Sequence, residues 1–273
     1  MMPALTERLG CSTITFRHQA LFEALESIHA TGLKKVDIAC IPGFCPHINP
    51  LEINAQEEQE LQNRLGNLGM TASTLNVSAG GLNTERKDFV FRFIQAAIDL
   101  VARLGCYAIT IPTGSKVAKT ELWMDHASIS AQSIRKLADH TTGKGIRLTL
   151  EAPHTGTLTE NVAETARFFQ LLDDLRVACT FDTSHVARGN PVPVERCIAK
   201  IGADIGHVHL RDCIGENNHL TPGKGEINFK EVLLELQKNG YAGDIIFELE
   251  GENSQQAAAE LIFAVRYLSG LAG

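Results

Sequence analysis

Residues 205–229 read IGHVHLRDCIGENNHLTPGKGEINF and begin with an alternation of apolar side chains and imidazoles. Successive side chains of a strand point to opposite faces, so His207, His209 and Arg211 would share one face. The residues between them are apolar, as in a strand that is covered by helices. This pattern indicates a buried strand that delivers ligands to a site at its C-terminal edge. Two core histidines with satisfied hydrogen bonds are the alternative.

A repeat runs outward from this strand over the whole chain. Five times an amphipathic helical stretch ends in glycine, and an apolar, strand-like run follows closely. Glycine is the usual residue after a helix, because it adopts the left-handed conformation without a Cβ penalty. The glycines of the repeat are Gly32, Gly69, Gly105, Gly145 and Gly240.

The repeat predicts eight strands separated by helices. The predicted strands are 9–16, 34–40, 71–77, 107–112, 147–152, 177–182, 206–211 and 244–250. Strands that alternate with helices form a parallel sheet, and the length suits a (β/α)₈ barrel. We therefore expect an α/β fold with a single TIM barrel over residues 1–273. A doubly wound open sheet is the alternative, although no G-x-G-x-x-G follows an early strand.

The composition and net charge argue against some classes of partner and cellular location. The chain has 273 residues and a formal net charge of −7, which argues against a nucleic-acid partner. Its seven cysteines form no CxxC pair and are typical of reduced thiols. The N-terminus has no apolar signal region, and no stretch approaches a membrane span. We expect a soluble cytoplasmic protein without a membrane partner.

Ligand-type side chains follow four consecutive predicted strands. In a parallel barrel, functional residues lie at the C-terminal ends of the strands. Several buried carboxylates at one place would be costly without a compensating cation. Mn²⁺, Mg²⁺ or Co²⁺ would suit this oxygen-rich set, and Zn²⁺ is compatible with it. Ordinary ion pairs or a helix cap are the alternatives for each residue alone. The four candidate metal ligands are Glu151, Asp182, His209 and Glu248.

The motifs LTLEAPH, TFDTSH, GHVHLRD, TPGKGEINF and GYAGDIIFELE resemble those of the xylose-isomerase-like sugar phosphate isomerase/epimerase superfamily. That superfamily includes ketose 3-epimerases, hydroxypyruvate isomerase, inosose isomerases and dehydratases, and endonuclease IV. The resemblance covers nearly the whole chain and implies a xylose-isomerase-like TIM barrel. It also implies metal ligation by the four residues above and a substrate contact by His185.

Other residues near the strand ends are candidates for binding substrate. His219 stands where ketose 3-epimerases have an arginine that contacts substrate oxygens, which leaves the substrate open. Three lysines could meet a substrate phosphate, or they could belong to a solvated surface. The additional substrate candidates are Arg211 and, more weakly, His154, Asn76 and His47; the lysines are Lys116, Lys119 and Lys224.

The resemblance implies an isomerase or epimerase of a small sugar, sugar phosphate or related polyol. Glu151 and Glu248 would act as acid and base across an enediolate, with the metal holding the substrate oxygens. A dehydratase of the inosose or dehydroshikimate type is the principal alternative. An endonuclease IV-like repair enzyme and a barrel that binds a sugar without catalysis are further alternatives. The expected partner is a small carbohydrate, and a homodimer or homotetramer is compatible with the sequence.

Overall fold

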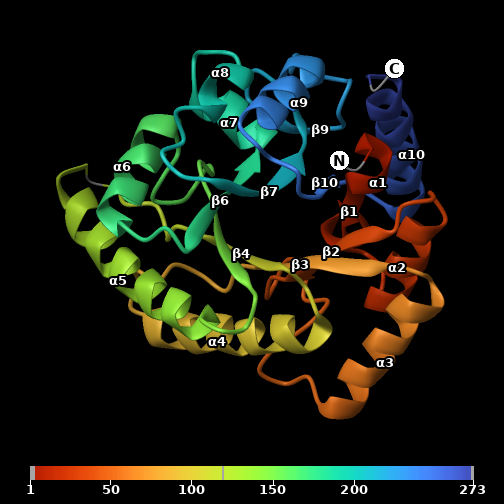
Figure 1. Ribbon diagram of the computed structural model, residues 1–273, viewed down its shortest axis with the longest axis horizontal. Coiled ribbons are helices and arrows are strands. Elements are labelled where there is room, and N and C mark those ends of the chain that lie inside the picture. The colour runs from red at the N-terminus through yellow and green to blue at the C-terminus, as the bar shows by residue number, and fades with distance from the viewer. Residues whose placement is uncertain (1–3, 119, 272–273) are drawn as a thin grey trace.

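Eight parallel strands close into a barrel in the computed structural model, which describes residues 4–118 and 120–271 (Figure 1). Neighbours around the barrel follow the order β1–β2–β3–β4–β5–β6–β7–β10, and β10 pairs with β1 to close it. The barrel strands are β1 (Leu9–Ser12), β2 (Lys35–Cys40), β3 (Thr71–Val77), β4 (Ala108–Pro112), β5 (Arg147–Glu151), β6 (Val177–Asp182), β7 (Ile205–Leu210) and β10 (Ile245–Phe247).

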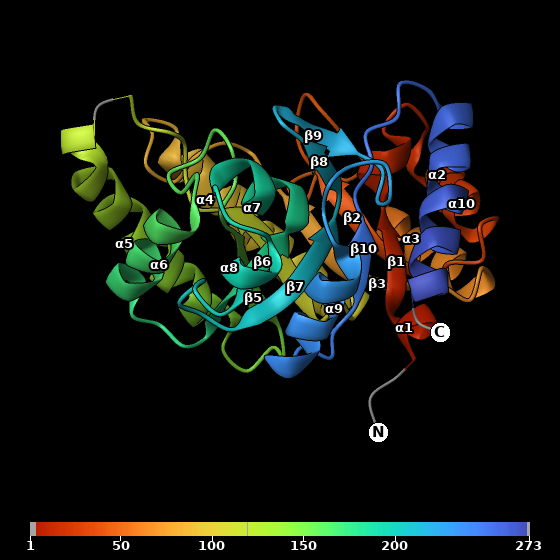
Figure 2. The ribbon, with the colours of Figure 1, turned by 90° about the horizontal axis from the view of Figure 1, so that it is seen from above.

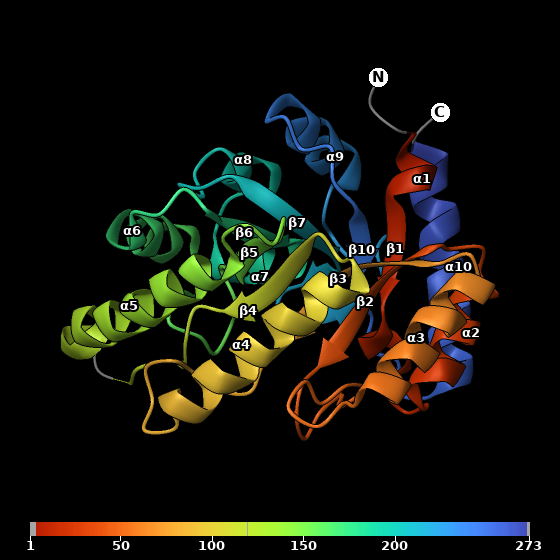
Figure 3. The ribbon, with the colours of Figure 1, turned by 60° about the horizontal axis from the view of Figure 1, so that its bottom comes forward.

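Helices surround the barrel and cover the outer face of the strands (Figure 3). The first and last described helices, α1 and α10, lie side by side in all three views of the ribbon. The helices are α1 (Leu5–Arg8), α2 (Leu21–His29), α3 (Ala55–Asn67), α4 (Lys87–Leu104), α5 (Trp123–Thr141), α6 (Val162–Leu172), α7 (Thr183–Gly189), α8 (Glu195–Ile198), α9 (Phe229–Lys238) and α10 (Ser254–Leu271), with the 3₁₀ turns η1 (Thr13–Phe16) and η2 (Thr120–Leu122).

The predicted TIM barrel is confirmed, and the open-sheet alternative is wrong because β1 pairs with β10. All five glycines of the repeat have positive φ. Gly105, with φ of 74°, ends α4, and its N–H donates to the carbonyl of Val101. A positive φ here lets the chain leave the helix and enter β4 within a few residues.

Two predicted strands are too long. The run 9–16 is a strand only over Leu9–Ser12, and η1 follows because the Ser12 side chain accepts a hydrogen bond from the N–H of Ile14. The run 244–250 is a strand only over Ile245–Phe247. In both places the chain leaves the barrel ladder at the edge where the strands end.

A two-stranded hairpin was not predicted after β7. Strands β8 (Asp212–Ile214) and β9 (Asn217–Leu220) form it, and it rises from the end of the barrel at which the strands finish (Figure 2). The buried Asp212 carboxylate accepts hydrogen bonds from the N–H groups of Gly223, Gly225 and Ile227. This aspartate therefore fixes the loop that follows the hairpin.

The barrel interior is polar below the strand ends. Thr110 lies 2.9 Å from Thr180 and 3.1 Å from Thr149, hydroxyl to hydroxyl, and Thr180 donates to Thr149 over 2.7 Å. Glu151 lies two residues after Thr149 on β5, and Asp182 lies two residues after Thr180 on β6. Strand alternation places each acid on the same inner face as its threonine.

All seven cysteines are buried and unpaired. Among the helices that the structure describes, none is both long enough and apolar enough to cross a membrane.

Candidate active site

Four side chains converge at the C-terminal end of the barrel. Glu151 ends β5, Asp182 ends β6, His209 lies on β7, and Glu248 directly follows β10. One ligand atom of each lies within 4.8 Å of the corresponding atoms of the others, and all four residues are buried. We call this set the carboxylate–histidine cluster. The structure thus brings together the four residues that were expected to share one ion.

The histidine of the cluster is held through both ring nitrogens. Its Nδ1 lies 3.2 Å from Oε1 of Glu151 and 3.6 Å from Oε2 of Glu248. Its Nε2 lies 3.0 Å from Oδ2 of Asp37, below the cluster. Burial works against the charged imidazole, but the charges of Glu248, Asp37 and Glu151 hold the pKa of His209 well above its ordinary value.

The two glutamates of the cluster differ in their environments. Burial raises the pKa of Glu248 to about 7, the charges of Glu151 and Asp182 add to this rise, and Arg211 opposes it. Burial also disfavours the charge on Glu151, but His154 and His209 bring its pKa below the ordinary range. Contrasting environments of this kind are typical of paired catalytic carboxyls.

The two carboxylate oxygens of Asp182 have different partners. Its Oδ1 caps α7 by accepting hydrogen bonds from the N–H groups of Ser184 and His185. Its Oδ2 lies 2.9 Å from Nε and 2.8 Å from Nη2 of Arg211. The helix cap that the sequence offered as an alternative role is therefore present, and the residue belongs to the cluster as well.

The donor set fits a divalent cation. Asp37, Glu151, Asp182 and Glu248 are four buried carboxyl groups, whereas Arg211 is the buried guanidinium beside them. Several buried negative charges around one point require protons or a cation for compensation. Three carboxylates and one imidazole suit Mn²⁺, Mg²⁺ or Co²⁺ better than the sulfur-rich sets of structural zinc sites.

Polar side chains surround the cluster on its outer side. Asn76 donates to Oε1 of Glu248 over 2.9 Å. Nη2 of Arg211 lies 2.7 Å from Nε2 of His185, and the rings of His185 and His154 are 3.8 Å apart between centroids. Burial and the charge of Arg211 hold the pKa of His185 well below its ordinary value. His185 is thus a neutral acceptor beside the cluster.

The hairpin β8–β9 carries His219 to the rim of the site. Its Nδ1 lies 2.9 Å from Oε1 of Glu250, and the side chain is 49% exposed. Oε1 of Glu250 also accepts from Nη1 of Arg211 over 3.0 Å. His219 is therefore a rim residue, linked to the buried cluster through Glu250 and Arg211.

A cavity of about 310 Å³ opens over the cluster. Its lining combines Glu151, Glu248 and Arg211 with the apolar side chains of Ile14 and Phe44. A second hollow adjoins it beneath the hairpin and shares several lining residues. The first volume is of the size that small-molecule sites usually have.

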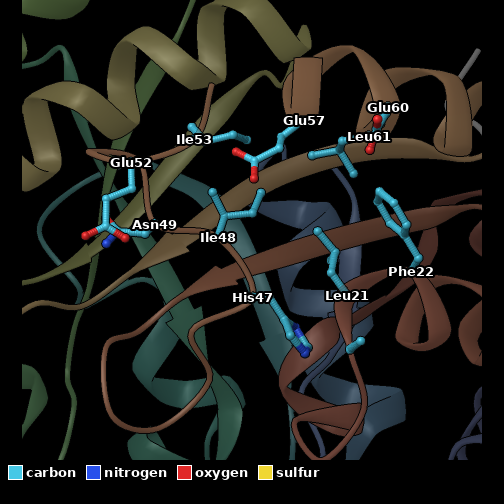
Figure 4. A pocket seen from close by; sticks show the side chains of 11 residues that line it. Leu21, Phe22, His47, Ile48, Asn49, Glu52, Ile53, Glu57, Glu60 and Leu61 are labelled. Atoms are coloured by element: carbon cyan, nitrogen blue, oxygen red, sulfur yellow. The ribbon is translucent and has the colours of Figure 1, made fainter. Parts of the chain in front are cut away.

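A separate groove lies on the outside of the barrel. It is lined by Leu21 and Phe22 of α2, by Ile48 and Ile53, and by Leu61 of α3 (Figure 4). His47, which the sequence offered as a weak site candidate, lines this groove, and its Nε2 lies 3.0 Å from the carbonyl oxygen of Gln19. None of the residues lining this groove belongs to the carboxylate–histidine cluster.

Three acidic residues of the site were either not predicted from the sequence or predicted without a role. Asp37 contacts His209, Glu250 joins Arg211 to His219, and Asp212 holds the loop behind the hairpin. Each is an acid inside or directly after an otherwise apolar strand run. That placement is a usable signal, because an acid rarely stands in a buried strand without a partner.

The sequence model of one family, described as the xylose isomerase-like TIM barrel, matches residues 25–268. The chain belongs to this family. One relative in sequence is the uncharacterized protein MJ1311 of Methanocaldococcus jannaschii, which is 24% identical over 273 residues. That match covers 97% of this chain and 90% of the relative.

Two further similarities are to proteins whose names state an activity. An inosose dehydratase of Serratia proteamaculans is 28% identical over 164 residues, which is 52% of this chain and 54% of that protein. The solved structure of D-psicose 3-epimerase from Clostridium cellulolyticum H10 with D-tagatose superposes with a TM-score of 0.80 at 18% identity. The superposition covers 97% of this chain and 99% of that chain, and shows that the two share the fold.

Proposed function

We propose that this chain is a divalent-metal-dependent isomerase or epimerase that acts on a small unphosphorylated ketose or related polyol. One observation carries the proposal: Glu151 and Glu248, from strands β5 and β10 that are not neighbours in the barrel, line the same small cavity. Two carboxylates that face one substrate from different sides can remove a proton from carbon and return it. The epimerase structures among the neighbours support this class.

Glu151, Asp182, His209 and Glu248 would hold the ion. When bound, a divalent ion polarises adjacent carbonyl and hydroxyl oxygens of the substrate and so acidifies the C–H between them. One glutamate then takes that proton, which leaves an enediolate form of the substrate, and the other glutamate donates a proton to complete the reaction. His185 and Asn76, which contact Arg211 and Glu248, would hold substrate hydroxyls beside these carboxylates.

The charges around the cavity favour an uncharged substrate. Within the described residues, both arginines that line the two hollows are paired with acidic side chains, and His219 also contacts one. Arg211 contacts Asp182, Glu248 and Glu250, Arg188 contacts Glu216, and His219 contacts Glu250. Lys116 pairs with Glu160 and Lys224 with Glu260, whereas Lys119 lies outside the described residues. A phosphate that bound to one of these paired cations would compete with the acid that the cation already contacts.

A screen of ketoses in D₂O with Mn²⁺, Mg²⁺ or Co²⁺, followed by NMR, tests the proposal. We expect a new ketose or aldose to form, with deuterium on the carbon next to the carbonyl. Free sugars should react faster than their phosphate esters. Turnover that never incorporates deuterium, with any sugar or metal, would contradict proton transfer by the two glutamates.

Dehydration of an inosose is the second candidate function. The matched half of the Serratia inosose dehydratase supports it. The first step would be the same, removal of a proton next to a carbonyl, but a neighbouring hydroxyl would then leave as water. Incubation with inososes separates the two candidates, because loss of water produces a conjugated product that absorbs in the ultraviolet.

The unpaired cysteines support a reducing, cytoplasmic location for either enzyme.

A further inference from the structure

A buried aspartate joins two histidines inside the barrel. Oδ2 of Asp37 lies 2.8 Å from Nε2 of His207 and 3.0 Å from Nε2 of His209. The exposed fraction of all three side chains is 0%. Asp37 belongs to β2 and the histidines to β7, strands that lie apart in the barrel. The contact therefore crosses the interior and is not part of a sheet ladder.

The hydrogen bonds of Asp37 fix where each imidazole carries its proton. A carboxylate oxygen can only accept hydrogen bonds, so each Nε2 that contacts it bears a hydrogen. For a neutral His209 this leaves Nδ1 without a hydrogen, and Nδ1 faces Glu151 and Glu248 in the cluster. An imidazole that binds a metal must present an unprotonated nitrogen.

We propose that Asp37 is a positioning residue, which holds His209 in the tautomer and ring orientation that present Nδ1 to the metal. The inference rests on the proposed function and extends it to a residue that does not itself contact the ion. Carboxylates that accept the second N–H of a metal-bound histidine commonly raise metal affinity in this way.

Packing and stability alone do not account for this aspartate. Its Oδ1 is buried without a hydrogen-bond partner among the described residues, and so is Oγ1 of Thr74, the residue paired with it on β3. An unsatisfied buried carboxylate oxygen costs free energy, whereas the other oxygen, Oδ2, satisfies the buried Nε2–H groups of His207 and His209. The role that we assign to the Asp37 carboxylate is its hydrogen bond with His209.

Metal titration of three variants tests the inference. Mn²⁺ affinity is measured by calorimetry for the wild type, Asp37→Asn, His207→Gln and Asp244→Asn. Asp37→Asn should weaken Mn²⁺ binding about 10- to 100-fold. His207→Gln disturbs the same buried network but leaves the Asp37–His209 contact, so its affinity should stay near that of the wild type. Asp244→Asn is the matched control, because this carboxylate contacts Ser73 and Lys35 and not the cluster.

A spectroscopic measurement reports the position of the proton directly. In the Zn²⁺-loaded wild type, ¹⁵N NMR of the imidazoles should show His209 with hydrogen on Nε2 and the metal on Nδ1. Asp37→Asn should lose or broaden this signature. Melting temperatures of the metal-free variants, recorded alongside, identify any loss that follows from unfolding.

The possible outcomes have different meanings. Unchanged affinity in Asp37→Asn, or equal losses in Asp37→Asn and His207→Gln, would overturn the positioning role while leaving the proposed function intact. A second Mn²⁺ ion in the wild type that both Asp37→Asn and His207→Gln abolish would also overturn it, because Asp37, His207 and His209 would then form a site of their own. A wild type that binds no divalent metal would reject the proposed function itself and the inference with it.

Discussion

Nη2 of Arg211 lies 2.8 Å from Oδ2 of Asp182, in an ion pair that is buried at the end of the barrel. The same nitrogen lies 3.3 Å from Oε2 of Glu248. The guanidinium therefore shares two carboxylates with the proposed metal, and cation and metal repel each other there.

Arg211→Met should consequently bind Mn²⁺ at least as tightly as the wild type. Turnover should nevertheless fall, because Arg211 lines the cavity and contacts His185. Calorimetry and a rate assay on the same sample measure the two effects. A variant that loses Mn²⁺ affinity would show that Arg211 mainly orients Asp182.

The two glutamates are expected to be essential for exchange. Glu248→Gln keeps the shape of the side chain, but the amide cannot accept and return a proton. We expect its turnover and its deuterium exchange to fall by about 10²- to 10⁴-fold. Metal content must be measured as well, because the same change removes a ligand charge. Glu26→Gln, which disturbs an exposed pair with Arg64 between α2 and α3, is the matched control and should remain active.

Divalent metal should stabilise the folded chain. A ligand that binds only the folded state at 100 times its Kd adds about 2.7 kcal/mol to the free energy of unfolding. Mn²⁺ should therefore raise the melting temperature of the chelator-treated wild type and restore its activity. Asp182→Asn should show little of this rise, because one ligand charge is missing. An equal rise in both proteins would place the Mn²⁺ elsewhere.

His185 is expected to serve the substrate and not the metal. His185→Ala should reduce turnover far more than it reduces metal content, because its Nε2 accepts from Arg211 and lies outside the cluster. Metal analysis and kinetics on one preparation separate the two effects. His140→Ala, on a helix surface beside Asp99, provides the control. Parallel losses of metal and rate would mean that His185 is a ligand.

The loop behind the hairpin offers a test of stability. A Cβ atom at position 225 would lie 2.2 Å from Oδ1 of Asp212, so Gly225→Ala must displace the carboxylate that holds the loop. We expect a loss of about 1–3 kcal/mol in the free energy of unfolding, measured with urea. Gly66→Ala in α3 meets no atom within 4 Å and should instead stabilise by about 0.5–1 kcal/mol.

The fold could be predicted from the sequence because the barrel repeats one local pattern, in which a helix, a glycine and a strand follow one another. Five glycines with positive φ each stand between a helix and the barrel strand that follows it, as Gly105 does between α4 and β4. The hairpin β8–β9 was missed because its strands are short, and because Asp212 folds the adjoining loop through contacts with Gly223 and Gly225. Contacts between a carboxylate and distant backbone N–H groups leave no periodic pattern in a sequence.

The sequence by itself determined which residues could form the site. Glu151, Asp182, His209 and Glu248 stand at strand ends, and parallel strands of a closed barrel must finish at the same edge. Only the tertiary structure decided how these groups are paired. The contact of Asp37 with His209 crosses the barrel interior, and that of Arg211 with Asp182 joins the ends of the neighbouring strands β6 and β7. Both depend on side-chain directions between residues that are 172 and 29 positions apart. Strand periodicity gives the face on which a side chain lies, and only packing across the barrel gives its partner.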